Sequence, residues 1–312
     1  MGLGMSAAMS CARVRETGLA APKQRSKSPV MVLRAGSYDM DLAELIVRGV
    51  AECRLAVKGK RVLLKPNLVE FDENTCINTD PRVVAAGVEA FQRLGAAEVL
   101  IGEGPGHRRD TWDLAEQAGY LRKIRRFTER FIDLNRDDVI RVQDFVGTHD
   151  MYISRAAVQA DLIVSMAKMK THHWSGATLS MKNFFGVVPG SVYGWPKNQL
   201  HYLGIEESIL GLNKFFRSKS FAIVDGIVGM EGNGPIQGTP KHAGVLVMGN
   251  DLAAVDATCC RIMKIDPRKI GYLANCSTGG IDPEWIEQRG AKIAEVKQDF
   301  TLIAKFQHLR EV

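Results

Sequence analysis

Short apolar runs alternate along the chain with segments in which apolar residues recur every three or four positions. The runs are typical of buried strands, and the periodic segments are typical of amphipathic helices. The runs predict strands at 31–34, 61–65, 98–101, 131–134, 161–166, 221–225 and 243–248. The periodic segments predict helices at 41–55, 80–94, 111–118, 154–160 and 251–263, with one more beginning at 266.

The order of these elements predicts an α/β fold. Strand, helix, strand, glycine-rich loop and helix follow one another from residue 61, which is the order of a parallel sheet covered on both faces. We therefore expect an open, mostly parallel sheet with helices on both faces and room for some antiparallel strands. One composite domain is expected over residues 29–312, after a flexible leader at 1–28.

Composition narrows the class of protein. Hydrophobic residues make up 46% and charged residues 24%, which excludes a disordered or fibrous chain. No apolar run approaches the ~18 residues of a membrane helix, and no export signal is evident, so a cytoplasmic protein without a membrane partner is expected. The six cysteines show no CxxC spacing, which argues against an iron–sulfur cluster and a zinc ribbon.

The net charge of +6 comes partly from the leader and partly from a basic run at 122–130. Helical spacing spreads that run around several faces, so a solvated surface is favoured over a nucleic-acid patch. No nucleic-acid motif supports a nucleic-acid partner. The oligomeric state stays open.

Polar segments follow several predicted strands, where open α/β sheets bind ligands. Lys65 and Asn67 could bind a carboxylate or phosphate, or be a solvated lysine and a turn-forming asparagine. The loop 102–107 has His107 where a dinucleotide fingerprint needs glycine, and a Walker lysine is absent, so standard motifs for NAD and ATP are excluded. His107 itself could be an acid, a base, a metal ligand or a structural residue.

The segment 165–186 is the densest in functional groups. A buried strand leads into lysines, imidazoles, hydroxyls and an amide, which favours a binding site over a solvated loop. The candidate residues here are Lys168, Lys170, His172, His173, Thr178, Lys182 and Asn183. Lys168 and Lys170 share a strand parity, so they would face the same side if the strand continues.

Three acidic residues offer further chemistry. Asp225 ends a predicted strand, and a glycine-rich loop carries Glu231; either could hold a divalent metal or act as a base, or merely suit a turn. Asp256 falls in the middle of a predicted helix among small apolar residues. A buried acid there needs a partner, and a lysine of the segment 165–186 is the expected one.

These segments together resemble the bacterial and archaeal domain of unknown function family 362 over about residues 60–275. The matching residues are Lys65-Pro66-Asn67, Thr79-Asp80-Pro81, Gly102-Glu103-Gly104, Lys168-Met169-Lys170-Thr171-His172, Thr178 to Asn183, Asp225-Gly226, Glu231 to Pro235 and Ala254 to Ala257. The resemblance implies a cytoplasmic α/β protein. Many members carry an iron–sulfur module, whose cysteines this chain lacks.

A fainter likeness links the same region to the nickel-pincer lactate racemase family. There a histidine, a glycine-containing turn and a lysine ten residues after the histidine occupy the cofactor site. His172 and Lys182 have that spacing, and His201 follows at a similar distance.

The leading hypothesis is an enzyme acting on a small anionic substrate, with isomerase- or racemase-like proton transfer. Lysines 65, 168, 170 and 182 would bind the anion with help from Asn67, Thr178 and Asn183, and His172 or His107, poised near neutral pH, would move protons. The acids would orient the lysines or hold a metal.

The alternative is a non-catalytic protein that binds a metal or metallo-cofactor through His107, His172, His173 and His201. An assembly protein with solvated loops is a third option. The enzyme hypothesis makes a geometric prediction: Lys65, His107, Lys182 and Asp225 converge on one cleft, because parallel strands place their carboxyl ends along one edge.

Overall fold

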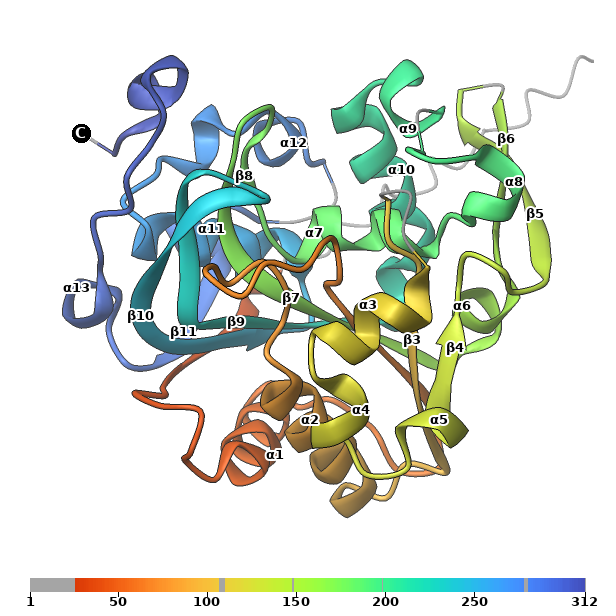
Figure 1. The fold of residues 1–312 in the computed structure, drawn as a ribbon. Helices are drawn as coiled ribbons and strands as arrows, with labels where there is room; N and C mark the ends of the chain where they lie inside the picture. Colours follow the sequence, from red (N-terminus) through yellow and green to blue (C-terminus); the bar gives the residue numbers. More distant parts are fainter. Residues whose placement is uncertain (1–25, 107–109, 148, 198, 278–279, 312) are drawn as a thin grey trace, which may run out of the picture.

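A nine-stranded mixed sheet forms the centre of the molecule (Figure 1). The computed structural model describes residues 26–106, 110–147, 149–197, 199–277 and 280–311. The strands of this sheet are β1 (Ser28–Arg34), β2 (Arg61–Pro66), β3 (Glu98–Glu103), β4 (Phe131–Asp133), β7 (Leu162–His172), β8 (Gly176–Thr178), β9 (Ser220–Asn233), β10 (Gln237–Gly249) and β11 (Ile286–Gly290). Their order is β11-β1-β10-β9-β7-β2-β3-β4, with β8 paired to β7.

The sheet is mostly parallel, as the order of elements predicts. Strands β9, β7, β2, β3 and β4 run parallel to one another, and β11 is parallel to β1. The antiparallel pairings are β10 with β9 and with β1, and the short β8 with β7. A separate two-stranded ribbon pairs β5 (Val139–Val146) with β6 (His149–Ser154).

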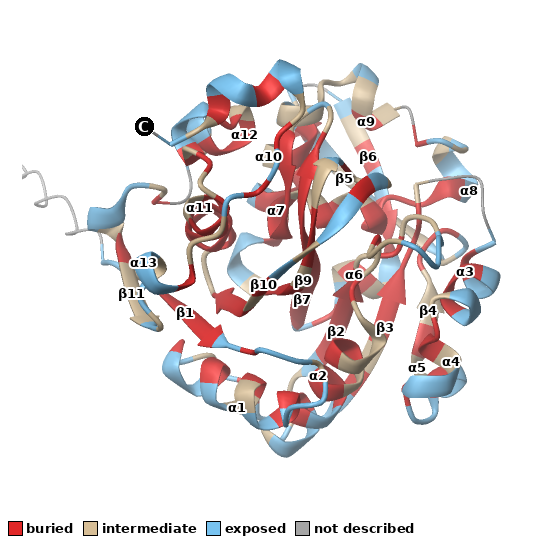
Figure 2. Cartoon of the chain, turned by 60° about the vertical axis from the view of Figure 1, so that its left-hand side comes forward, coloured by how far each residue is buried: buried red, intermediate tan, exposed pale blue. Residues whose placement is uncertain are grey.

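Helices cover both faces of the sheet, because alternate strand residues point to opposite sides. Val30 and Val32 of β1 belong to one hydrophobic core, whereas Met31 and Leu33 belong to the other. Helices α1 (Leu42–Glu52) and α2 (Pro81–Arg93) cover the second core, and α7 (Ser180–Asn183), α10 (Ile205–Phe216) and α11 (Leu252–Ile262) cover the first. Figure 2 shows the buried sheet between helices whose outer sides are exposed.

Shorter helices complete the chain: α3 (Thr111–Gln117), α4 (Tyr120–Lys123), α5 (Phe127–Arg130), α6 (Arg155–Gln159), α8 (Gly190–Tyr193), α9 (Gln199–Tyr202), α12 (Gly271–Ala274) and α13 (Ile293–Val296). The predicted helix starts are confirmed where a side chain caps the helix. Asp80 accepts a hydrogen bond from Arg82 N with Pro81 in the first turn, and Asp251 accepts from Ala253 N and Ala254 N.

The glycine-rich segment after Asp225 was expected to be a loop, and that expectation is wrong. Strand β9 continues to Asn233 and pairs with β10 along most of its length. Glycine here allows close backbone approach, since a Cβ at Gly229 would lie 2.7 Å from Met169 O. Strand β7 also runs further than predicted, to His172, so Lys168 and Lys170 both lie within it.

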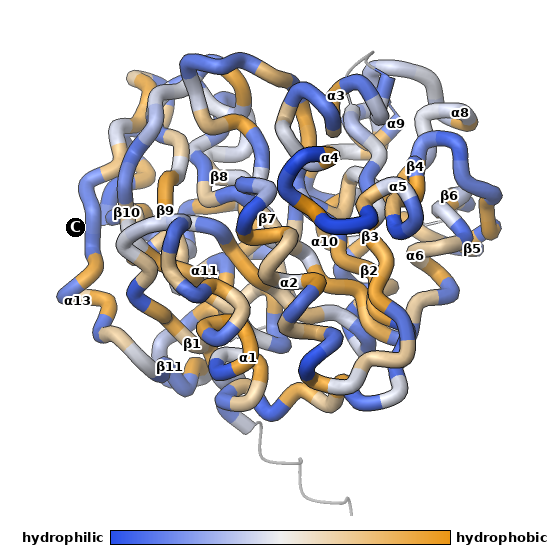
Figure 3. Tube along the Cα trace, turned by 60° about the horizontal axis from the view of Figure 1, so that its bottom comes forward, coloured by the Kyte–Doolittle hydropathy of each residue, from blue (hydrophilic) through white to orange (hydrophobic). Residues whose placement is uncertain are grey.

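The basic run 122–130 lies in and around α4 and α5. Figure 3 shows this segment as strongly hydrophilic, and most of its residues are exposed. Arg126 pairs with Glu129, and Arg130 donates a hydrogen bond to Val99 O. In the described part of the chain, no helix combines the length and hydropathy needed to span a membrane. The predicted leader falls almost entirely outside the described residues.

Candidate functional site

A cavity of about 470 Å³ lies at the carboxyl ends of β2, β3 and β7. Among the described residues, its charged lining consists of Lys65, Glu103, Lys170, Lys182 and Lys197. Imidazoles of His172, His173 and His201, with Asn67, Thr178, Asn183 and the rings of Trp174 and Phe185, line it as well. The structure therefore brings most of the lysine and histidine candidates to one place at this edge of the sheet.

Lys65 and Glu103 form a buried ion pair at the ends of β2 and β3; each is 1% exposed. The Lys65 amine donates to both carboxylate oxygens at 2.9 and 2.8 Å, to Pro66 O at 3.0 Å and to Asn183 Oδ1 at 3.1 Å. These acceptors occupy all three N–H groups of the ammonium. Burial lowers the pKa of Lys65, and the Glu103 carboxylate opposes that shift. Lys65 therefore orders the site and offers no free donor to a ligand.

Lys170 is also fully engaged, but by neutral oxygens. Its amine donates to Asn67 Oδ1 and Ile77 O at 2.8 Å each, and more weakly to Pro235 O at 3.4 Å. Burial, followed by the nearby charges of Lys182 and Lys168, lowers its pKa to about 7. Lys170 thus connects the loop after β2 with the turn between β9 and β10.

Lys182 and Lys197 are the cavity lysines with unused donors. The Lys182 amine has no hydrogen-bond acceptor among the described residues and lies 4.9 Å from the centroid of the Phe185 ring. Desolvation lowers its pKa to about 8. Lys197 donates once, to Gly104 O at 2.6 Å, and burial lowers its pKa to about 7 although Glu103 opposes the shift. Both amines can therefore donate to a ligand.

His172 is held as a neutral imidazole. Its Nδ1 accepts the backbone N–H groups of Trp174 at 3.0 Å and Ser175 at 3.2 Å, so the ring proton lies on Nε2. Burial and the Lys182 charge hold the pKa of His172 far below its usual range. The expectation that His172 titrates near neutral pH is therefore wrong, because the ring is desolvated among cations. Its Nε2–H remains a donor.

The imidazoles of His173 and His201 both contact the Trp174 ring. His173 stacks on His172 with ring centroids 5.0 Å apart, and its Nδ1 lies 2.7 Å from Gly234 O. His201 packs edge-on against Trp174 at 5.3 Å. Among the described residues, no three His, Cys, Asp or Glu side chains gather closely enough to hold a metal ion. His107 lies outside the described residues.

Asp225 and Lys168 form a second buried ion pair, away from the cavity. Their side chains meet at 2.6 Å, and Tyr38 Oη donates to Asp225 and accepts from Lys168 at 3.0 Å each. Burial lowers the pKa of Lys168, but the Asp225 carboxylate, Tyr38 and Cys76 together outweigh burial and raise it overall. Lys168 and Tyr38 line a separate cavity of about 280 Å³.

The predicted cleft formed by Lys65, His107, Lys182 and Asp225 is therefore only partly present. Lys65 and Lys182 line one cavity, but Asp225 does not line it, because β9 continues past Asp225 and turns its carboxylate toward Lys168. Glu231 lies elsewhere too: it accepts from Thr301 N at 2.8 Å and lies 3.5 Å from Lys241.

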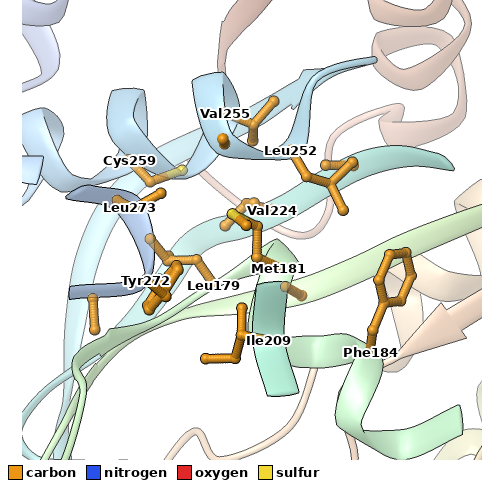
Figure 4. Packing of buried hydrophobic residues seen from close by; sticks show 14 of the residues in the cluster. Leu179, Met181, Phe184, Ile209, Val224, Leu252, Val255, Cys259, Tyr272 and Leu273 are labelled. Carbon is orange, nitrogen blue, oxygen red and sulfur yellow. The ribbon is translucent and has the colours of Figure 1, made fainter. Parts of the chain in front are cut away.

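Asp256 supports the element that carries Lys182. Its fully buried carboxylate, in α11, accepts Ser180 N at 2.9 Å, Met181 N at 3.0 Å and the Ser180 hydroxyl. The partner is thus the start of α7, and the expectation of a lysine is wrong. Desolvation raises the pKa of Asp256 to about 7, although these hydrogen bonds oppose the shift. Figure 4 shows Met181 and Phe184, which flank Lys182, among the buried hydrophobic residues of this face.

Asn183, a lining residue of the cavity, is held by hydrogen bonds to β2 and β7. Its amide Nδ2 donates to Lys65 O at 2.9 Å and to Ser165 Oγ at 3.1 Å, so both ends of the amide are used within the protein.

The sequence interpretation missed Lys197 and the role of Glu103. Lys197 follows Trp-Pro in an irregular segment, and no local pattern distinguishes it from a solvated lysine.

Comparison with known proteins finds similar chains by sequence and by structure. The protein described as "Thylakoid-associated protein sll1697" from Synechocystis sp. is 30% identical over 265 residues, which are 81% of this chain and 80% of that protein.

Two solved structures are more distant. The lactate racemase apoprotein from Thermoanaerobacterium thermosaccharolyticum has a TM-score of 0.49 at 13% identity, covering 79% of this chain and 59% of that one. A Thermotoga maritima protein has a TM-score of 0.45 at 15% identity, covering 73% and 59%. This chain therefore spans less than two thirds of either solved chain.

A family model matches residues 62–261, a range close to the one that the sequence motifs suggested. That range holds β2, β3, β7 and β9 with α7 and α11, and so includes both buried ion pairs and the cavity lysines. The chain belongs to the family described as Domain of unknown function (DUF362).

Proposed function

We propose that this protein is an enzyme that binds a small carboxylate or phosphate in the Lys182 cavity and transfers a proton to or from it. One observation supports the proposal above the others. The Lys182 amine lines a largely apolar cavity and has no hydrogen-bond acceptor among the described residues. A partly buried cation without a counter-charge favours an anionic ligand, because removing a charge from water is costly unless it is paired.

The neighbouring groups suggest a division of roles. Lys197 would bind the anion with its remaining N–H groups, and the Nε2–H of His172 would donate a further hydrogen bond. Lys182 would carry the proton, because a pKa of about 8 allows an amine to exchange its proton near neutral pH. Lys65, Glu103 and Asn183 would act as positioning residues.

The reaction can be tested without knowing the substrate. Purified protein is incubated in D₂O with a panel of hydroxy, amino and phosphorylated acids, and NMR follows the loss of carbon-bound protons. A substrate should exchange a proton only with active protein, and Lys182→Met should abolish that exchange with an unchanged melting temperature. Lys214→Met, on the exposed side of α10, is the matched control and should keep full activity. Full activity in Lys182→Met would exclude this site.

The non-catalytic alternative predicts a different result. A metal-binding protein would hold a stoichiometric metal that is lost on His172→Ala, and would catalyse no exchange. We further propose that the protein acts in the cytoplasm on a small molecule, without a nucleic-acid or membrane partner. The thylakoid association in the name of the Synechocystis relative is the competing location, and cell fractionation decides between them.

A further inference from the structure

We infer that the substrate of this cavity carries at least two negative charges on an apolar body, as an aryl phosphate or an aromatic dicarboxylate does, rather than a single carboxylate. This inference rests on the proposed function and narrows its substrate class. The charge balance of the cavity, the donors left free within it, and its size and lining carry the argument.

Basic side chains outnumber acidic ones in the lining of the cavity. Four lysines and one acid, Glu103, are the charged groups among its described lining residues. Glu103 is paired at 2.8 Å with Lys65, which leaves the amines of Lys170, Lys182 and Lys197 without a carboxylate partner. The separate 280 Å³ cavity differs, since the lysine in its described lining, Lys168, is matched by Asp225.

Two of the three uncompensated amines can contact a ligand. Among the described residues, Lys197 has one acceptor, Gly104 O, and Lys182 has none, so at least two N–H groups on each stay available. The donors of Lys170 are used, but by uncharged oxygens, so no carboxylate balances the charge of its protonated form. Two separate amines favour a ligand with two anionic charges.

A single negative charge would balance only one of these three amines when all are protonated. Charges interact more strongly at buried sites than in water, so each additional anionic charge contributes more here than on an exposed surface. The lowered pKa values of Lys182 and Lys197 agree, because they reflect the cost of charging desolvated amines. An anion should raise both pKa values when it binds.

The size and lining of the cavity indicate an apolar body on the ligand. Its 470 Å³ equals roughly fifteen water volumes at ~30 Å³ each, so a three-carbon acid would leave most of it to solvent. Phe185, Leu200 and Ile236 contribute apolar surface, and Trp174 is 57% exposed. An aromatic ring fits such walls better than a short polar acid.

Matched pairs of small anions test the inference by isothermal titration calorimetry at pH 7. Phenyl phosphate is mainly dianionic, and benzenesulfonate has a similar shape with one charge. Phthalate and benzoate form the corresponding carboxylate pair. The dianion of at least one pair should bind at least about tenfold more tightly than its monoanion, since charge-assisted hydrogen bonds are the strong ones and a dianion can accept them from both amines. The two pairs show whether phosphate or dicarboxylate is the preferred chemistry.

Variants identify the source of any preference. Lys197→Met keeps the length of the side chain and removes its charge, and it should reduce the dianion preference to about threefold or less. Lys182→Met should do the same, whereas the exposed control Lys214→Met should bind like the wild type. Circular dichroism checks that each variant is folded.

The outcomes separate the two proposals. Monoanions that bind as tightly as dianions, with binding still lost in Lys182→Met, would overturn the dianion inference and leave the anion site intact. Absence of binding by all four probes, or binding that neither lysine variant weakens, would overturn both. A dianion preference that depends on Lys182 and Lys197 supports both.

Discussion

The substitution Glu103→Gln tests how the buried ion pair supports the site. The wild-type carboxylate accepts four hydrogen bonds: two from the Lys65 amine, one from Leu68 N at 3.1 Å and one from Gly104 N at 2.8 Å. Glutamine has nearly the same shape but only one acceptor oxygen. Either orientation of its amide turns an NH₂ group toward a backbone N–H and leaves Lys65 without a counter-charge.

The expected loss of stability is large because both partners are almost completely buried. Removing one partner of a buried ion pair costs about 3–5 kcal/mol, and an unsatisfied buried backbone N–H costs about 1–3 kcal/mol. These terms overlap, so we expect Glu103→Gln to lower the free energy of unfolding by about 4 kcal/mol at pH 7.

The loss should depend on pH with a definite sign. The pKa of Lys65 is already lowered by burial, and without the carboxylate it falls further below its unfolded value of 10.5. The unfolded chain then binds one proton more than the folded chain between those two pKa values, so the stability of the variant rises with pH. The deficit relative to wild type should therefore shrink as pH rises from the pKa of Lys65 in the folded variant to its higher pKa in folded wild type.

Urea unfolding followed by circular dichroism and tryptophan fluorescence measures both effects. Glu98→Gln is the matched control, because Glu98 lies at the other end of the same strand in an exposed pair with Arg61. Such a surface pair contributes under about 1 kcal/mol. If Glu103→Gln costs no more than Glu98→Gln, or if its deficit does not change with pH, the assigned role of the buried pair is wrong.

Three further predictions follow from single contacts. Gly186→Ala should destabilise the protein, because its Cβ would lie 2.0 Å from Glu103 Oε1, whereas Gly106→Ala meets nothing within 4 Å and should be neutral in thermal unfolding. Burial raises the pKa of Asp256 from 3.8 to about 7. The stability of wild type relative to Asp256→Asn should therefore be highest below pH 3.8 and should fall as pH rises through about 7. A stability difference that does not change with pH would contradict this. Anions that bind the cavity should change tryptophan emission in wild type but much less in Trp174→Phe, since Trp174 is a half-exposed residue of its lining. An unchanged response in the variant would place binding elsewhere.

Local patterns in the sequence were sufficient for much of the fold. Apolar runs identified most strands of the large sheet, and helical periodicity identified α1, α2 and α11. The alternation of strand and helix correctly predicted a mostly parallel sheet. These features depend on neighbouring residues, and so a single sequence carries them.

Local patterns failed for a segment whose secondary structure depends on pairing with distant strands. The glycines after Asp225 are typical of a loop, yet the segment pairs with β7 on one side and β10 on the other. Pairing with two neighbours satisfies the backbone of a glycine-rich segment that would not form a strand alone.

In the candidate site, too, local sequence patterns determined some features and the tertiary structure determined others. Residue type and the position of strand ends indicated where Lys65, Lys170, His172 and Lys182 would gather, because parallel strands end at one edge. Which lysine is free to meet a ligand was decided only by the tertiary structure. Glu103 uses the donors of Lys65, backbone oxygens and Asn67 use those of Lys170, and Lys182 is left with none of these acceptors. Lysine has the same chemistry at every position, and only the folded chain determines which acceptors and counter-charges each buried amine meets.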